Sequence, residues 1–165
     1  MAVVVPRALL ALLLLSVSGL VAAQRDCYGA VVEVTVLSDD DSTPLDAFYG
    51  YPGPFGMALN DTATEQYPVA VADPVNACGK VAQAPTPGAA AVVARGNCSF
   101  ADKAWALQRA GYGAMLLFNN EEECVLMSAN RTEAQGLTLA VASLTQETGA
   151  LLQQLLAEHA AGGSA

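Results

Sequence analysis

The sequence contains a single histidine, His159, which limits the catalytic arrangements that it can hold. A Ser-His-Asp or Cys-His arrangement would have to use that one side chain. The motifs G-x-S-x-G, H-E-x-x-H and G-x-G-x-x-G and the P-loop are also absent. We therefore expect no catalytic activity from these 165 residues alone, and no cofactor.

Basic residues are scarce: Lys and Arg together number 7 against 16 Asp and Glu, for a net charge of -9. Nucleic acids and anionic membrane surfaces both require concentrated positive charge, so we exclude them as partners. The acidic runs at 39–41 and 121–123 read as solvated loops. They have no apolar pocket to raise one pKa for acid–base catalysis, and 39–41 lacks the glycine and the distal glutamate of an EF-hand calcium loop.

No apolar run approaches the roughly 20 residues of a comfortable membrane span. The run at 8–15 follows Arg7 and precedes small residues that end at Ala23. This pattern predicts a secretory signal peptide over residues 1–23, with an uncleaved anchor as the alternative. We expect one domain over residues 24–160, followed by a flexible tail over 161–165, and no transmembrane segment.

Four cysteines remain after the predicted cleavage, and in an oxidising compartment they predict two disulfides. Their spacings contain no C-x-x-C, so a zinc site is not expected. Three pairings are possible. We prefer Cys78 with Cys98, because each lies at a turn beside an inner strand and the enclosed loop is short. That choice leaves Cys27 with Cys124.

Three glycosylation sequons lie in expected loops or turns, at Asn60, Asn97 and Asn130. Modification is plausible at Asn60 and Asn130, whereas a disulfide at Cys98 would hinder it at the adjacent Asn97. Together with the signal peptide, the sequons predict a glycoprotein of the secretory pathway, located outside the cell or in an endomembrane lumen.

The most strongly determined stretch is residues 89–120. Its two ends, 89–94 and 113–118, are continuous apolar runs typical of strands that are covered on both faces. A helix is expected between them. Strand, helix and strand within about 30 residues form a βαβ unit with parallel strands and a right-handed crossover.

The expected helix has recognisable ends. Ser99 lies three residues before Asp102, which is the spacing of an N-terminal cap, and Gly111 suits the left-handed conformation that ends a helix. Helical periodicity turns Phe100, Ala104, Leu107 and Ala110 inward. The same periodicity predicts that Lys103 and Arg109 face water.

Further strands are expected over 28–37, 67–72 and 137–144, and a second helix after Thr145. The turn-forming residues of 49–56 predict an irregular loop, for which packing on the core is favoured over display on a binding surface. An acidic loop is expected from 121 to 136.

The central stretch also resembles the signature of a known family. The resemblance lies in Val93 to Phe100, Lys103, Gln108 to Gly111 and Ala114 to Asn120. These segments closely resemble protease-associated (PA) domains, which occur in signal-peptide-peptidase-like proteins, transmembrane RING-type ubiquitin ligases, vacuolar sorting receptors and some secreted peptidases. Residues 119–149 look most like the signal-peptide-peptidase-like branch.

The resemblance implies an α/β fold, a small mixed β-barrel or sandwich with flanking helices, and a role in binding peptides or proteins, or in controlling substrate access or sorting. The alternative is that the chain is the lumenal regulatory domain of a signal-peptide-peptidase-like intramembrane aspartic protease. Because loops usually carry function, we expect the partner, a peptide or protein, to meet two loops, near residues 49–56 and 119–136. Their candidate residues are Tyr49, Tyr51, Phe55, Asn119, Asn120 and Glu121.

Overall fold

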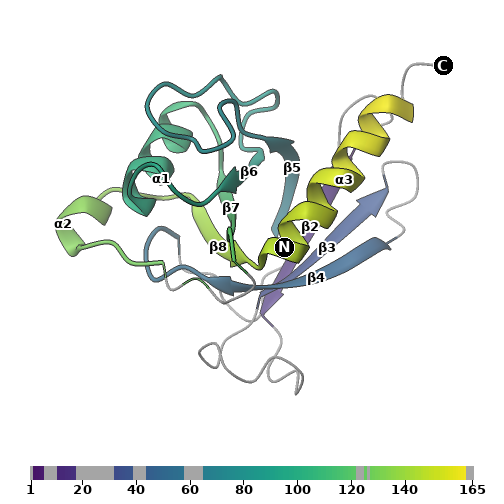
Figure 1. Ribbon diagram of the computed structural model, residues 1–165, viewed down its shortest axis with the longest axis horizontal. Coiled ribbons are helices and arrows are strands. Elements are labelled where there is room, and N and C mark those ends of the chain that lie inside the picture. Colours follow the sequence, from purple (N-terminus) through teal and green to yellow (C-terminus); the bar gives the residue numbers. More distant parts are fainter. Residues whose placement is uncertain are drawn as a thin grey trace.

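The computed structural model describes residues 2–5, 11–17, 32–38, 44–57, 65–121, 125 and 127–162. Its elements follow the order β1 (Ala2–Val5), β2 (Ala11–Val17), β3 (Val32–Ser38), β4 (Pro44–Pro52), β5 (Glu65–Val71), β6 (Ala90–Ala94), α1 (Phe100–Arg109), β7 (Ala114–Phe118), α2 (Arg131–Ala134), β8 (Ala140–Leu144) and α3 (Gln146–Gly162). Figure 1 shows them, and the strands close into a barrel in the order β1-β2-β3-β4-β8-β7-β6-β5. The expected mixed α/β architecture is confirmed.

The inner part of the barrel is parallel: β5 pairs with β6, β6 with β7 and β7 with β8 in parallel register. The β6–α1–β7 segment is therefore the predicted βαβ unit. Strands β6 and β7 are buried over their first four residues and β8 over its full length, as continuous apolar runs require. Successive side chains of a strand point to opposite faces of the sheet, so each of these strands contributes buried side chains to both faces.

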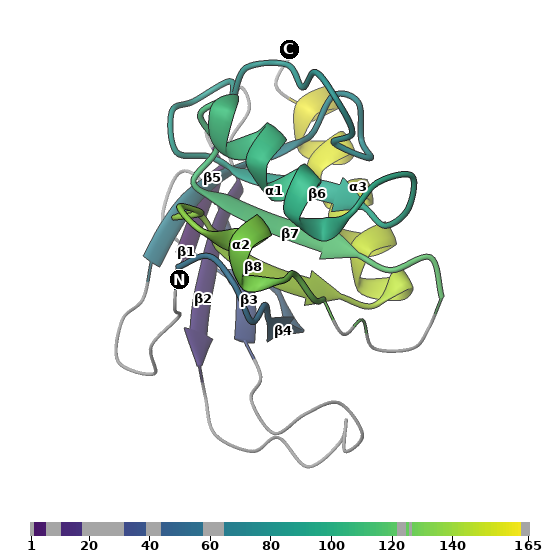
Figure 2. The same cartoon turned by 90° about the vertical axis from the view of Figure 1, so that its left-hand side faces the viewer.

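Two helices cover the opposite faces of these strands, as two views of the molecule show (Figure 1, Figure 2). Helix α1 packs against the face that carries Val93, Met115 and Leu117. Helix α3 lies on the other face, where a side chain at Gly149 would collide with Phe118 and where Leu152 is fully buried.

Both predicted ends of α1 are present. The hydroxyl of Ser99 accepts a hydrogen bond from the N–H of Asp102 at 3.1 Å and donates to the Asp102 carboxylate at 2.7 Å. Gly111 has a φ of 84°, the left-handed conformation that a glycine adopts without strain.

Two segments differ from the sequence expectation. Residues 49–52 belong to β4, because Gly50 pairs with Val32 of β3 and Tyr51 pairs with Ser143 of β8. These are long-range pairings that the local turn formers do not indicate. Part of the expected acidic loop is helix α2, because Asn130 and Glu133 form a reciprocal capping box.

Helix α3 continues to Gly162, so the first two residues of the expected tail are helical. Strands β1 and β2 lie within the predicted signal peptide and pair with β3 and β5. Cleavage after Ala23 stays a prediction. Cys27, Asn60 and Cys124 lie outside the described residues, as do residues 28–31 of the first expected strand. Within the described ranges, no helix has the length and apolar character needed to cross a membrane.

Candidate functional site

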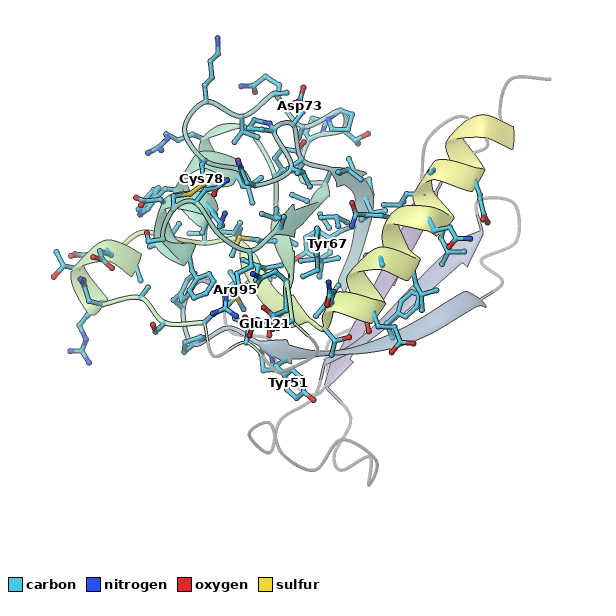
Figure 3. The ribbon with its side chains drawn as sticks, in the orientation of Figure 1. Tyr51, Tyr67, Asp73, Cys78, Arg95 and Glu121 are labelled. Atoms are coloured by element: carbon cyan, nitrogen blue, oxygen red, sulfur yellow. A yellow bond between two sulfur atoms is a disulfide. The ribbon has the colours of Figure 1, made fainter. Side chains whose placement is uncertain are left out.

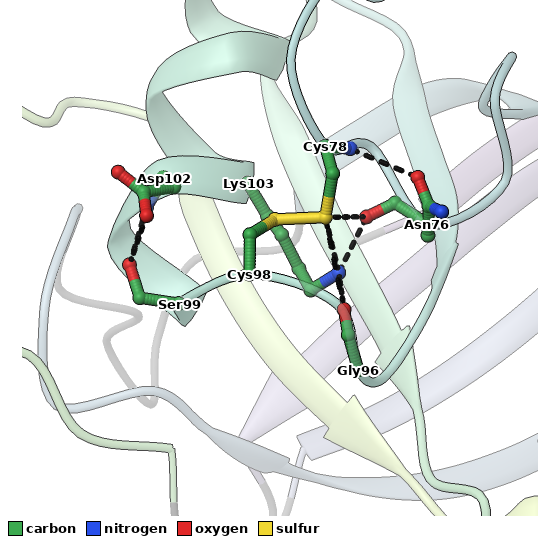
Figure 4. Close-up of a disulfide and its surroundings, with 7 residues drawn as sticks. All are labelled: Asn76, Cys78, Gly96, Cys98, Ser99, Asp102 and Lys103. Atoms are coloured by element: carbon green, nitrogen blue, oxygen red, sulfur yellow. Dashed lines mark hydrogen bonds between the residues drawn. A yellow bond between two sulfur atoms is a disulfide. The ribbon is translucent and has the colours of Figure 1, made fainter.

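The turn before α1 is fixed by a disulfide between Cys78 and Cys98, the pair preferred from the sequence (Figure 4). The bond ties the segment that follows β5 to the first residues after β6, and the two Cα atoms are 5.9 Å apart. Two residues of these turns, Ala77 and Asn97, have positive φ angles although neither is glycine. The covalent link therefore holds together two turns whose backbone is partly strained.

Lys103 is fully buried beside this disulfide, which corrects the expectation that it faces water. Its ammonium group donates to the carbonyl oxygen of Gly96 at 2.6 Å, to the carbonyl oxygen of Asn76 and to the Cys78 sulfur at 3.5 Å (Figure 4). Burial lowers the pKa of Lys103. Because all three acceptors of its ammonium group belong to the two turns that the disulfide joins, Lys103 holds these turns together and acts as a structural clamp.

Arg95 has the opposite environment. It follows β6, its side chain is exposed, and its Nη1 donates to the Oδ1 of Asn119 at 2.8 Å. Asn119, directly after β7, is fully buried and also accepts the N–H of Asn120 at 2.9 Å. Figure 3 labels Arg95 where the inner strands end. The carboxyl ends of parallel strands are where α/β sheets commonly bind ligands.

A separate shallow hollow of about 600 Å³ lies between the segment after β4 and helix α2. Its walls come from Pro54, Phe55 and Gly56 on one side and from Ala129, Arg131 and Leu137 on the other. Both segments belong to the two loops that the sequence analysis named as the recognition surface. Their side chains therefore meet in space, although the hollow is open and shallow.

The named residues themselves are divided. Tyr51 and Phe55 are buried, which agrees with the expectation that this segment packs on the core. Asn119 is also buried, and its side chain accepts the hydrogen bond from Arg95. Asn120 and Glu121 are exposed. Tyr49 lies in β4, paired with Glu33, and its side chain is not described.

The Tyr51 hydroxyl is buried, and within the described part of the chain it has no hydrogen-bond partner. Burial raises the pKa of this phenol.

Arg95 was absent from the sequence-based set of candidate residues. A signal for it was present in the sequence, since an arginine and an asparagine each follow directly after an inner apolar strand.

Titratable side chains do not gather into a centre in the described ranges: no group of three or more His, Cys, Asp and Glu side chains is placed to hold a metal ion there. His159 lies in α3 and its side chain is not described. The described residues instead contain an exposed arginine held by a buried asparagine, a shallow hollow between the segment after β4 and α2, and a turn braced by a disulfide.

Several known proteins resemble parts of the chain. Signal peptide peptidase-like 3 of Arabidopsis thaliana is 26% identical over 136 residues, covering 81% of this chain and 25% of that protein. Signal peptide peptidase-like 2 of the same plant is 29% identical and covers 79% of this chain and 25% of that protein. A third protein of Arabidopsis thaliana, receptor homology region, transmembrane domain- and RING domain-containing protein 2, is 31% identical over 91 residues. The match covers 52% of this chain and 20% of that protein. The chain thus spans a quarter or less of these relatives.

Among solved structures, a zinc aminopeptidase from Bacillus subtilis superposes with a TM-score of 0.50 at 22% identity, over 66% of this chain and 26% of that one. At this identity the likeness concerns the fold. The model of the PA domain matches residues 65–152, which include the inner parallel strands, the disulfide and α1. The chain belongs to the PA domain family.

Proposed function

We propose that the chain is a non-catalytic module that binds peptides or proteins in the lumen of the secretory pathway or outside the cell. The observation that carries this proposal is the exposed guanidinium of Arg95, positioned by the buried amide of Asn119. An arginine has five N–H donors, and the bond to Asn119 uses one of them. Within the described residues the other donors have no partner, and they can therefore meet a ligand carboxylate in the planar, two-pronged geometry that guanidinium groups favour.

The net charge of the chain supports the same interpretation. Sixteen acidic residues outnumber seven basic ones, so most of the surface repels carboxylates. An arginine held at the ends of the parallel strands is then a local exception. The preferred ligand would be a peptide that presents an acidic side chain or its own terminal carboxylate to Arg95, with neighbouring residues reaching toward the exposed Asn120.

A binding assay tests this proposal. The glycosylated, disulfide-bonded chain would be titrated against fluorescein-labelled decapeptide pools that are acidic, neutral or basic, each with a free or an amidated C-terminus. Changing Arg95 to Gln (R95Q) is expected to weaken the best pool by about tenfold, the loss of one charge-assisted contact. The matched control R109Q removes an exposed arginine from the end of α1 and is expected to change affinity less than twofold.

Two results would count against the proposal. Equal losses in R95Q and R109Q would assign the binding to diffuse charge rather than to the positioned guanidinium. A folded chain that retains no pool better than a scrambled pool would remove peptide recognition itself. Turnover of the same peptides by the purified chain, persisting when His159 is changed to Ala, would overturn the non-catalytic part.

A second candidate function is favoured by the relatives' names and lengths. Two relatives are described as signal peptide peptidase-like, and this chain matches a quarter of each. The chain would then be the lumenal regulatory domain of an intramembrane protease. Extending the coding frame past Ala165 tests this alternative: several hydrophobic spans would favour it, and a stop codon would remove it.

A further inference from the structure

A second hollow, of about 440 Å³, lies at strand β5, among elements other than those that present Arg95. Three consecutive residues of β5, Val69 to Val71, contribute to its wall. Because consecutive residues of a strand point to opposite faces, this hollow follows the strand edge rather than one face of the sheet. Tyr112 from beyond α1 and Leu156 from α3 line it, so elements from both sides of the sheet meet there.

Among the described residues, the backbone of β5 has no strand partner on its outer side along this stretch. Ala72 donates its N–H to Val92 of β6 at 3.1 Å. Since strand N–H and C=O groups alternate in direction, those of Val69 and Val71 face away from β6. In the part of the chain that the structure describes, no strand pairs with Val69–Val71 on that side. Unpaired strand edges are the groups to which extended peptides add.

The first half of the same edge shows what kind of segment it accepts. In the chain before the predicted cleavage, residues 65–68 of β5 pair there with the leucine run of β2, with Leu12 opposite Pro68 and Leu15 opposite Glu65 in antiparallel register. An extended, leucine-rich strand is therefore compatible with this edge. The hollow continues the edge toward the end of β5.

The walls of the hollow are apolar and anchored. Val71 is 41% exposed and Leu156 is partly exposed. The segment opposite is held by backbone bonds from Ala82 to the carbonyl of Asp73 and from Ala84 to the carbonyl of Ala110, both 2.8 Å. A hollow whose walls are already fixed loses little entropy on binding.

Asp73 is the charged residue of the lining, and it is exposed. Its carboxylate contributes to raising the pKa of the neighbouring Tyr112 hydroxyl, after burial, which is the main cause. No lysine or arginine lines the hollow in the described ranges. A bound segment therefore meets apolar walls and one negative charge.

We propose that the β5 edge at Val69–Val71 binds an extended peptide by strand addition, with an apolar side chain in the hollow and a lysine or arginine beside Asp73. This peptide differs in charge from the one proposed for Arg95, so the variants R95Q and D73N distinguish the two sites. The main chain of the peptide supplies hydrogen bonds to the edge. Its alternating side chains supply selectivity.

The probe is a fluorescein-labelled decapeptide of alternating leucine and serine with one central lysine, titrated into the intact chain. A second peptide carries glutamate in place of the lysine, and a third is N-methylated at alternate backbone nitrogens. The lysine peptide is expected to bind about fivefold tighter than the glutamate peptide, in line with one exposed charge pair turned from attraction to repulsion. This comparison is made in the R95Q chain, because the glutamate peptide could otherwise bind at Arg95, and adding D73N (Asp73 to Asn) is expected to abolish the difference. R95Q alone is expected to leave the affinity of the lysine peptide unchanged.

The hollow is tested by L156E, which places a charge in its apolar wall and is expected to weaken all these peptides by about tenfold or more. The matched control L151E changes an exposed leucine of α3 outside the lining and is expected to alter affinity less than twofold. Thermal unfolding of each variant shows whether its fold is intact. If L156E does not fold, D73N and the peptide series still decide.

N-methylation is expected to cost about tenfold, because it removes the donors that strand addition requires. Equal binding of the methylated peptide would overturn strand addition. A lysine preference that survives D73N would overturn the assigned site. A loss of lysine-peptide binding on going from the parent chain to R95Q would instead place these peptides at the first site.

Discussion

Lys103 and Arg95 are two cations of one short segment, and the fold treats them in opposite ways. The Lys103 ammonium is fully buried and has three acceptors, two of them backbone carbonyls. The Arg95 side chain is exposed, and its one partner among the described residues is the amide of Asn119. A buried charge must have its hydrogen bonds satisfied internally, whereas an exposed one keeps donors for a ligand. The difference separates a residue that holds two turns together from the residue that we propose for peptide binding.

The largest expected effect concerns the bond beside Lys103. Replacing Cys78 and Cys98 together by Ser is expected to lower the free energy of unfolding by about 3 kcal/mol, because a loop of this length is no longer closed in the unfolded chain. Urea denaturation of the non-reduced chain measures the change. If the double variant is as stable as the parent, the disulfide does not brace the turn that surrounds Lys103. The contrast between a structural Lys103 and an exposed Arg95 then loses its main support.

Changing Lys103 to Met (K103M) is expected to lower the free energy of unfolding by about 2 kcal/mol, because the partly buried hydrogen bonds to the carbonyls of Gly96 and Asn76 are lost. The matched control R109M removes an exposed cation of the same helix and is expected to change stability by less than about 0.5 kcal/mol. Denaturant midpoints of the two variants give the comparison directly. Similar midpoints would mean that Lys103 contributes no more than a surface charge.

The parts of this contrast that the sequence predicts are local. The strands around α1 are recognised because they are continuous apolar runs, and α1 is recognised because Ser99, Asp102 and Gly111 mark its ends within a few residues. Disulfide pairing follows from turns that flank these strands. Each of these inferences uses short-range geometry, and in each the structure agrees with it.

The parts that the sequence does not predict depend on distant partners. Helical periodicity turns Lys103 outward, yet one of its acceptors is Asn76, 27 residues away. Arg95 and Asn119 are 24 residues apart, and only the parallel register of β6 and β7 brings them together. The composition of residues 49–52 is typical of turns, but these residues form a strand because Tyr51 pairs with Ser143. Tertiary context therefore decides where the function-bearing side chains lie.

The smallest expected effect on stability is at Arg95, where R95Q is expected to change the free energy of unfolding by less than about 0.5 kcal/mol, because the side chain is exposed.

Changing Asn119 to Ala sharpens the comparison between Arg95 and Lys103. It keeps the guanidinium but removes its partner and the acceptor of the Asn120 N–H, so it is expected to cost about 1 kcal/mol of stability. Its effect on acidic-peptide affinity should be smaller than that of R95Q, since the positive charge remains. If R95Q destabilises the chain as much as K103M while peptide affinity is unchanged, then Arg95 is a second clamp, and recognition must be sought at the hollow beside α2 or at the edge of β5.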